Sequence, residues 1–374
     1  MSASRNAPDA PRVTLKTIAR ALGLDHSTVG YALSGKGTIK DETRRRVVEA
    51  AARMGYVPSR AARRVRGSAA AAVGLVVPNV VMGYTELVQH ASREARQSGC
   101  DLHVSLSEFD HAFERAAVET LLESRVSGII LKTLYSTWNG VPGDHPLRAA
   151  AKRATPLVLL GGPLRGSPFA AVATDVAEIG RRLGAHLAAR GRREVALLFH
   201  QAPPASRNAK RMAEGVSEGL GHRAGRGGVR VVLLEREARS AARARADGVN
   251  VHYRAQIDAF LEDGASAAAR ALFDKAWERS RRPEAIVCQN EMLALGVMAE
   301  AVRRGVRIPD DVAVAAADRS YAASFAPLSL TTASVPARSV AREAFRLLAD
   351  IRSGEAHRDE VRPLAPELVE GDST

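Results

Sequence analysis

The stretch from Val13 to Gly67 decides how this chain is built, and it reads VTLKTIARALGLDHSTVGYALSGKGTIKDETRRRVVEAAARMGYVPSRAARRVRG. Apolar residues recur at helical spacing from Leu15 to Ala21 and Gly23 follows them, which predicts a short helix with one apolar face. Asp25 is a good N-cap for a second short helix, because its carboxylate can accept the amide of Thr28. Two helices joined by a tight turn that contains Gly form a helix-turn-helix.

A third amphipathic helix follows, with Asp41 and Glu42 in its first turn, where the helix dipole favours anions. Between Met1 and Gly67 there are fourteen Lys and Arg residues against five Asp and Glu, a net charge of +9 out of +13 for the whole chain. A run of like charge is usually a solvated surface, and a helix pair alone is usually an ordinary hairpin. Positive charge concentrated on a small three-helix unit instead indicates phosphate binding.

The second helix of such a unit enters the DNA major groove, and residues at its start reach base edges. The predicted solvent-facing positions of this helix are His26, Ser27 and Tyr31. His26 and Ser27 can donate and accept hydrogen bonds in the groove, and Tyr31 can pack on a thymine methyl group or reach a phosphate. The stretch therefore predicts a DNA-binding module.

The runs TLKTIARALGLDHSTV, ALSG, TRRRV and GYVPSRAARRVRG resemble the N-terminal headpiece of the lactose-repressor (LacI/GalR) family of bacterial transcriptional regulators. In that family the segment after the third helix is a hinge that becomes helical only on operator DNA, and a Leu from each of two chains wedges into the minor groove. The resemblance places the start of the hinge at Pro58, its small interface position at Ala62 and its wedge at Val65. Because Val is shorter and stiffer than Leu, we expect a shallower intercalation. Lys40 stands where the family usually has a Ser or Thr N-cap.

The resemblance implies three parts. We expect residues 1–57 to form the helix-turn-helix headpiece, residues 58–68 a hinge helix or linker, and residues 69–374 a two-lobed effector-binding and dimerisation domain. The expected DNA contacts are Thr14, Lys16, His26, Ser27, Thr28, Tyr31, Arg60, Ala62 and Val65.

The length and composition of the chain indicate a cytoplasmic protein. Its 374 residues give room for about two or three domains. The polar N-terminus lacks the apolar core of a signal peptide, and the longest apolar run, Ala69 to Val77, is too short to cross a bilayer. Cys100 and Cys288 are far apart in the sequence and have no metal-ligand neighbours, so we expect reduced thiols, no metal and no cofactor.

After Gly67 the chain alternates between short apolar runs and helical patterns, which implies parallel sheets with helices on both faces. So many units exceed one sheet of normal width, so two α/β lobes are expected. The predicted strands are Val73–Val77, Leu102–Leu106, Gly128–Leu131, Leu157–Leu160, Ala170–Val172, Val195–Phe199, Val229–Leu234, Ala285–Cys288 and Val312–Ala316. The predicted helices are Tyr84–Ser98, Ala112–Ser124, Pro146–Ala154, Val176–Arg190, Arg207–Gly219, Ala265–Arg279 and Met292–Arg304.

The order of motifs in this part again resembles the lactose-repressor family, whose effector domain is built like a periplasmic sugar-binding protein. The runs that carry the resemblance are RVSGII near Arg125, VATD at Val172–Asp175, CQNEMLALG at Cys288–Gly296, IPDDVAV at Ile308–Val314, PLSLTT at Pro327–Thr332 and PELV near Pro366. The family's chain crosses between its lobes three times, and motif position places the crossings near Ala170, Val306–Asp310 and Thr332. Ligands of open α/β sheets lie outside the carboxyl ends of the strands, so we expect the effector in the cleft.

Matching these motifs residue by residue gives five candidate effector contacts: Asn79, Tyr84, Arg211, Asn290 and Asp318. Arg211 can bind a ligand through its forked guanidinium, but it could also be a solvated helix residue, and Glu214 stands where the family usually has Gly, which leaves the helix register open. Asn290 could bind a polyol or only form a turn, and Tyr84 could equally be a core residue. Asp318 matches the family's acidic ligand contact at a lobe crossing.

Departures from the family argue against a galactoside. Gly161 stands where galactoside-binding members carry an acid, and Val335 and Ala337 stand where they carry Gln and an aromatic residue.

Two motifs suggest an enzyme, but neither has the required context. Residues 30–36 match the start of a phosphate-binding loop, but Gly37 replaces the Ser or Thr that would hold magnesium. Ser217 in the run GVSEG matches a nucleophile elbow, but it lies far along a predicted helix instead of at a strand-to-helix turn.

The sequence thus predicts a sequence-specific transcriptional regulator and not an enzyme. By its family it is most often a repressor, which binds a palindromic operator as a homodimer and responds to a sugar-like small molecule, with no membrane partner. No heptad pattern follows Glu370, so a tetramer is not expected. One alternative is a sugar-binding protein or an α/β sugar enzyme with a non-functional headpiece. Another keeps the DNA role but makes the effector a protein, or has none.

Overall fold

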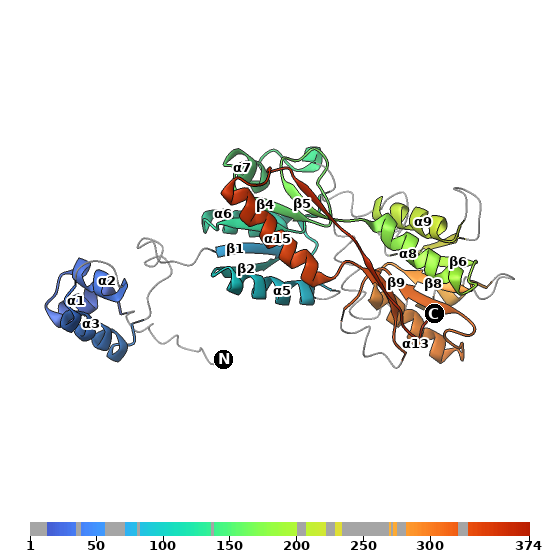
Figure 1. Cartoon of the computed structure of the whole chain (residues 1–374), viewed down its shortest axis with the longest axis horizontal. Coiled ribbons are helices and arrows are strands. Elements are labelled where there is room, and N and C mark those ends of the chain that lie inside the picture. Colours follow the sequence, from blue (N-terminus) through green and yellow to red (C-terminus); the bar gives the residue numbers. More distant parts are fainter. Residues whose placement is uncertain are drawn as a thin grey trace, which may run out of the picture. The chain divides into compact units, whose positions relative to one another are not determined.

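Figure 1 shows a computed structural model of the chain, which divides into two compact units, Met1–Ala71 and Ala72–Thr374. The structure describes residues 13–34, 39–56, 72–80, 83–135, 138–199, 207–221, 229–233, 269–270, 272–274, 282–320 and 328–374. The hinge expected at 58–68 and most of the helix expected at Ala265–Arg279 lie outside the described residues.

The first unit contains the three predicted helices, α1 (Leu15–Leu22), α2 (His26–Ser34) and α3 (Asp41–Arg53). Each helix contributes one side chain with 0% exposure to a shared core: Ile18, Val29 and Val47. Gly23 ends α1 in the left-handed conformation (φ 66°), which glycine adopts without steric cost. The helix-turn-helix expected from the sequence is therefore confirmed in its helices and in their packing.

The residues that precede α2 and α3 differ in whether their side chains cap the helix. Asp25 caps α2 as predicted, but its Oδ1 accepts the amide of Ser27 at 2.7 Å and the Ser27 hydroxyl, so the expected bond from Thr28 is wrong by one residue. Lys40 precedes α3 and makes no side-chain cap bond, as expected from its departure from the family pattern.

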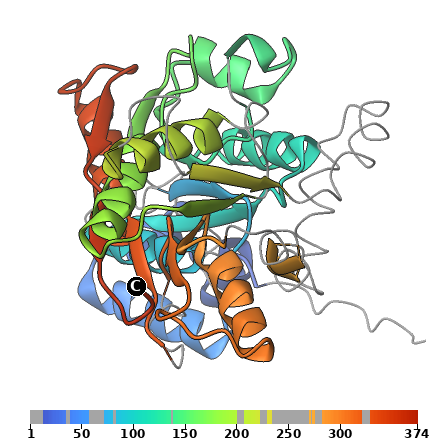
Figure 2. The same cartoon turned by 90° about the vertical axis from the view of Figure 1, so that its right-hand side faces the viewer.

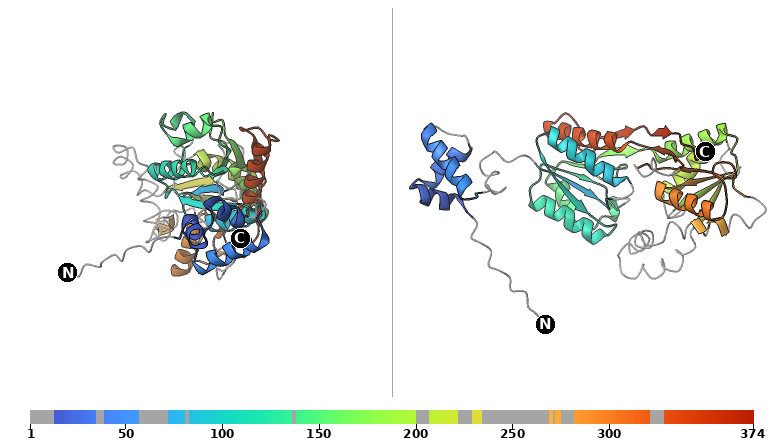
Figure 3. Two further views of the ribbon diagram at one scale, coloured as in Figure 1. Left: turned by 90° about the vertical axis from the view of Figure 1, so that its left-hand side faces the viewer. Right: turned by 90° about the horizontal axis from the view of Figure 1, so that it is seen from below.

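The second unit has two α/β lobes. The first lobe is a six-stranded, all-parallel sheet in the order β11-β5-β4-β3-β1-β2. Helices α5 and α15 lie side by side on one face of this sheet (Figure 3), and α6 and α7 cover the other. Its elements are β1 (Ala72–Val77), α5 (Tyr84–Gln97), β2 (Asp101–Leu106), α6 (His111–Glu123), β3 (Gly128–Leu131), α7 (Pro146–Lys152), β4 (Leu157–Leu160), β5 (Ala170–Thr174), α15 (Ala337–Ser353) and β11 (Val361–Leu364).

The second lobe has a sheet of the same size in the order β12-β10-β9-β8-β6-β7, parallel except for β12, which runs antiparallel to β10. Helices α8 and α9 cover one face, and α13 covers the other. Its elements are α8 (Val176–Ala189), β6 (Val195–Phe199), α9 (Arg207–Gly219), β7 (Val229–Leu233), β8 (Ala285–Cys288), α13 (Glu291–Arg303), β9 (Ala313–Ala316), β10 (Thr331–Ser334) and β12 (Glu367–Val369). The predicted two-lobed fold with parallel sheets is confirmed.

Between the strands and helices that the structure describes, the chain crosses from one lobe to the other at three places, and the predicted positions are partly wrong. It crosses at Asp175, between β5 and α8, and at Val335–Pro336, between β10 and α15, each a few residues after the predicted position. The third crossing is at Ala365–Pro366, between β11 and β12. The expected crossing at Val306–Asp310 is wrong, because this segment joins α13 to β9 within the second lobe.

Helices α8 and α9 lie side by side, as the two yellow-green helices of Figure 2 show. Four glycines let their backbones approach closely. A methyl group on Gly180 or Gly184 of α8 would collide with a backbone carbonyl of α9, and one on Gly215 or Gly219 would collide with a carbonyl of α8. Small residues four apart let two helix backbones come into direct contact. The glycines of the GVSEG run therefore serve helix packing, which removes the remaining structural argument for a nucleophile elbow at Ser217.

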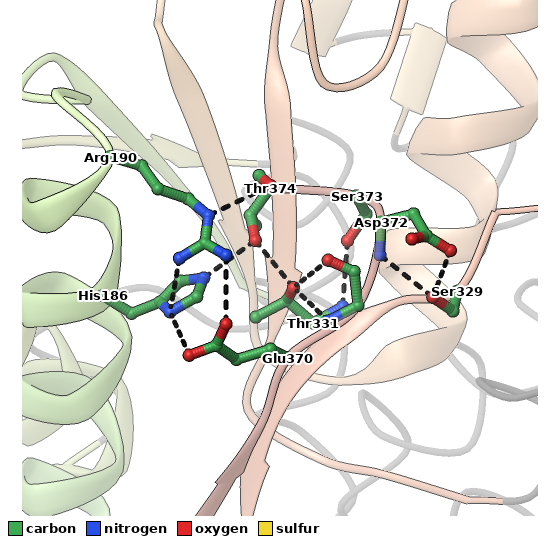
Figure 4. A network of polar contacts seen from close by, with 9 residues as sticks. His186, Arg190, Ser329, Thr331, Glu370, Asp372, Ser373 and Thr374 are labelled. Atoms are coloured by element: carbon green, nitrogen blue, oxygen red, sulfur yellow. Dashed lines mark hydrogen bonds and ion pairs between the residues drawn. The ribbon is translucent and has the colours of Figure 1, made fainter.

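The segment after β12 is held against the second lobe by a polar network (Figure 4). The buried Ser373 hydroxyl accepts the Thr331 amide at 2.9 Å and donates to the Val314 carbonyl at 2.6 Å. Arg190, which directly follows α8, donates to the Thr374 carbonyl and pairs with Glu370 at 3.0 Å. These bonds join α8 to the strands around β10.

Candidate functional site

The start of α2 presents the side chains expected to read DNA. His26 and Ser27 are exposed, and Tyr31 is 52% exposed although it is aromatic. The hydrogen bond from the Ser27 hydroxyl is the largest cause that lowers the pKa of the Asp25 carboxyl. Because Ser27 donates to Asp25, its oxygen is oriented and keeps its capacity to accept from a partner.

The remaining DNA-contact candidates divide into three groups. Lys16 is exposed on α1, and Thr28 is half-buried on α2. Thr14 forms a capping box with Thr17, in which each side chain accepts the other's amide, at 3.3 and 3.2 Å, so Thr14 also has a structural role. The hinge positions fall outside the described residues: Arg60, Ala62 and Val65.

In the second unit a cavity of about 410 Å³ lies between the two lobes. The first lobe contributes the start of α5 and the residues that follow β3 and β4, and the second contributes Asp318–Ser320 after β9. The crossing segments also line it, through Thr174, Ser334–Arg338 and Glu367. These positions lie at or beyond carboxyl ends of parallel strands, where open α/β sheets bind their ligands. Its volume lies within the range of small-molecule sites.

Asp318 brings the two lobes into contact at this cavity. A methyl group on Gly83, just before α5, would lie 3.3 Å from Asp318 Oδ1, so the carboxylate lies close to the backbone at the start of this helix. Burial raises the pKa of Asp318 to about 7, and the neighbouring Glu291 and Glu86 carboxylates act in the same direction. The Arg319 amide, which donates to Asp318 at 2.9 Å, partly opposes this effect. A carboxyl group that is partly protonated near neutral pH can both donate to and accept from a hydroxylated ligand.

The other four effector candidates are placed differently. Tyr84 lines the cavity and also packs on the core of the first lobe, so its role in the core is confirmed and its contact with a ligand stays a prediction. Asn290 accepts the Leu293 amide at 3.0 Å and caps α13. Arg211 pairs with Asp175 at 2.9 Å, and Asn79 follows β1. Asn79, Arg211 and Asn290 are not among the residues that line this cavity, so their ligand contacts stay predictions.

The cavity also contains Lys132, which we did not predict. Lys132 directly follows β3, and its Nζ lies 3.4 Å from the Leu160 carbonyl. A methyl group on Gly161 would collide with this Nζ, so the glycine leaves the space that the ammonium group uses. The sequence does show a lysine immediately after an apolar strand, and this pattern could have indicated Lys132 as a candidate cavity residue.

A second polar cluster lies in the first lobe at the carboxyl end of β3. The fully buried Glu114 of α6 accepts the Thr133 hydroxyl at 2.8 Å and the Leu134 amide at 2.6 Å. Burial raises the pKa of Glu114 to about 7, against the effect of these two bonds. The nearby His145 is 2% exposed, and burial lowers its pKa to about 4. The cluster is thus an interior network that holds the loop after β3.

No cluster of three His, Cys, Asp or Glu side chains suited to a metal occurs in the described parts of the chain. Within the same ranges, no helix has the length and apolar character needed to cross a bilayer.

Comparison with known proteins identifies the family. Residues 14–59 match "Bacterial regulatory proteins, lacI family". Residues 70–256 match "Periplasmic binding proteins and sugar binding domain of LacI family", and residues 185–374, more than half of the chain, match "Periplasmic binding protein-like domain". The chain belongs to the lacI family of bacterial regulatory proteins.

Relatives within the lacI family extend over almost the whole chain. The HTH-type transcriptional repressor PurR of Vibrio cholerae is 26% identical over 96% of this chain and 97% of its own length. The regulator DegA of Bacillus subtilis is 24% identical over 97% of this chain and 98% of its own. Both are described as HTH-type transcriptional regulators or repressors, not as enzymes.

Solved structures show the same fold. The lac repressor dimer bound to operator and the anti-inducer ONPF aligns with a TM-score of 0.72 at 21% identity, over 97% of this chain and 99% of that one. A complex of the transcriptional regulator CelR with cellobiose aligns with a TM-score of 0.60 at 22% identity, over 97% and 100%. A chain of this family is a DNA-binding regulator with an effector domain, which agrees with the exposed α2 and the inter-lobe cavity.

Proposed function

We propose that this lacI-family chain is a sequence-specific transcriptional repressor that binds a palindromic operator as a homodimer in the cytoplasm. A sugar-like small molecule changes its affinity for DNA, and the protein is not an enzyme. The observation that carries the proposal is the combination, in one chain, of a helix-turn-helix with an exposed recognition face and a two-lobed domain with an inter-lobe cavity. His26, Ser27 and Tyr31 are the proposed base contacts, with residues 58–68 as the hinge.

Two features support a homodimer. One short recognition helix reads few base pairs, so two copies related by a two-fold axis match a palindromic site. Strand β2 is an edge of the first lobe's sheet and exposes Val104 and Leu106, each 40% exposed, on one face. An exposed apolar edge strand favours pairing with another surface.

The position of the cavity supports a mechanism for the switch. All three crossing segments contribute to its lining, through Thr174, Ser334–Arg338 and Glu367. A molecule bound there contacts both lobes and the segments about which they would move. An effector can shift an equilibrium only by its difference in affinity between two states, and a lobe-bridging site gives such a difference when the lobes change their separation.

The experiment is to select bound sequences from a random DNA pool with the full-length protein, and then to measure the affinity of variants for the selected duplex. His26→Ala and Tyr31→Ala should each weaken binding to the selected duplex by about tenfold or more, because a specific base contact contributes about 1–3 kcal/mol. Affinity for random DNA should change little. Val48→Ala, an exposed apolar position on α3, is the matched control. A sugar-binding protein or enzyme with a non-functional headpiece would yield no enriched sequence and only weak, steeply salt-dependent binding.

A further inference from the structure

We propose that the effector of this protein carries an anionic group, a carboxylate or a phosphate, which binds to Lys132 in the inter-lobe cavity. The proposal rests on the regulatory function proposed above and names the chemistry of its ligand.

Lys132 has no carboxylate partner among the side chains that the structure describes. Its Nζ donates a long hydrogen bond, 3.4 Å, to the Leu160 carbonyl. Burial lowers the pKa of the Lys132 ammonium. An enclosed charge without a partner is costly, so a lysine at such a position is stabilised when an anion arrives.

The surrounding backbone leaves room for this lysine. Gly161 has a φ of 87°, and a side chain there would collide with Lys132 Nζ. The Lys132 ammonium group therefore lies in the space beside Gly161, and a ligand group that fits next to it has the opposite charge.

The other charged side chains of the cavity indicate what the rest of the ligand is. Glu86, Asp318 and Glu367 line the cavity together with His90, Arg319 and Arg338, so acidic and basic groups are both present. Acidic side chains accept hydrogen bonds from hydroxyl groups, and Asp318, with a pKa of about 7, can also donate one. A ligand that carries both an anionic group and hydroxyl groups satisfies Lys132 and the acidic side chains. A sugar acid or a sugar phosphate has this chemistry, whereas a neutral sugar would leave Lys132 uncompensated.

The test compares acids with their neutral parents by titration calorimetry on the full-length protein. The panel contains galacturonate, glucuronate and gluconate, the 6-phosphates of galactose and glucose, and galactose and glucose themselves. At least one acid or phosphate should bind, about tenfold or more tightly than its neutral parent, because hydrogen bonds to charged groups are the stronger ones. Whether the carboxylates or the phosphates bind distinguishes the two sources of negative charge.

Two variants and a control assign the effect to Lys132. Lys132→Met keeps the length of the side chain and removes the charge, and Lys132→Gln keeps a hydrogen-bond donor. Both should weaken binding of the acid by about tenfold, because each removes the positive charge. Lys152→Met, on the exposed surface of α7, should change neither the affinity for the acid nor the affinity for DNA.

Three results would overturn the inference: a neutral parent that binds as tightly as its acid, an acid whose affinity is the same for wild type and Lys132→Met, or a panel in which no anion binds. The selection from random DNA needs no effector, so it tests the proposed DNA binding independently of the proposed anionic effector. Sequence-specific DNA binding together with any of these three results would refute the anionic effector and leave the proposed regulator intact.

Discussion

The buried Glu114 should make the first lobe less stable as the pH rises toward neutrality, and Glu114→Gln should remove this dependence. The pKa of Glu114 rises from 4.5 to about 7 on folding. Between these values the unfolded chain has lost the proton and the folded chain retains it, so stability falls with increasing pH through this window and the full penalty is present above pH 7. The difference corresponds to about 3 kcal/mol.

The substitution suits the site, because a Gln oxygen can still accept the Leu134 amide and its amide group can donate to the Thr133 hydroxyl. Urea unfolding of the full-length protein should therefore show a variant that differs little from wild type near pH 4.5 and is more stable by about 3 kcal/mol at pH 8. Trp138, which packs edge-on against Phe169 in the first lobe, reports this transition by fluorescence in a Trp277→Phe background.

Glu119→Gln is the matched control, because Glu119 is exposed on the same helix. It should change stability by less than about 0.5 kcal/mol at either pH. If Glu114→Gln is equally destabilised at pH 5 and pH 8, then Glu114 is ionised in the folded protein and the reasoning from burial is refuted.

Two further predictions concern packing and capping. Gly184→Ala should destabilise the second lobe by about 2 kcal/mol in urea unfolding, because its methyl group collides with the Val216 carbonyl, although Ala is the better helix former. The control Gly143→Ala meets open space and should be neutral, and equal stabilities for the two variants would contradict the close approach of α8 and α9. Lys40→Ser should stabilise α3 by about 1 kcal/mol, because Ser supplies the cap bond that Lys40 lacks, and amide hydrogen exchange in α3 should be roughly fivefold slower. Lys40→Ala should give no gain in stability. Equal exchange rates for the two variants would show that the missing cap bond does not determine the stability of α3.

Much of the fold follows from local patterns. Strands such as Leu157–Leu160 and Val195–Phe199 are continuous apolar runs, and the structure has them at the predicted residues. The helix Ala337–Ser353 was not predicted, although its buried residues Ala341, Phe345 and Leu348 follow helical spacing, so the signal is present in the sequence.

The lobe crossings could not be derived in the same way. Whether a strand continues one sheet or joins the other depends on pairing between distant segments, and no local pattern at Val306–Asp310 or Ala365–Pro366 records it. The predicted crossing at Val306–Asp310 relied on motif position and was wrong for this reason.

Only part of the cavity lining could be predicted from the sequence. Motif position named Asp318 and Tyr84 as candidate effector contacts, and both line the cavity. Lys132 and Gly161 follow two different strands, and their contact depends on β3 pairing with β4. The role of the glycines in α8 and α9 likewise exists only when the two helices are packed together, so each GxxxG run alone had no clear meaning.

The central claim is that a helix-turn-helix unit binds a specific DNA site and that a ligand in the cavity adjusts this binding. The most direct measurement is fluorescence anisotropy of the full-length protein at 0.15 M salt with the selected duplex and with a scrambled duplex of equal composition, each with and without the anionic ligand. The account predicts a preference of about a thousandfold or more for the selected duplex, and a change of about fivefold or more in that affinity when the ligand is added. Equal affinities for the two duplexes, unchanged by the ligand, would contradict it.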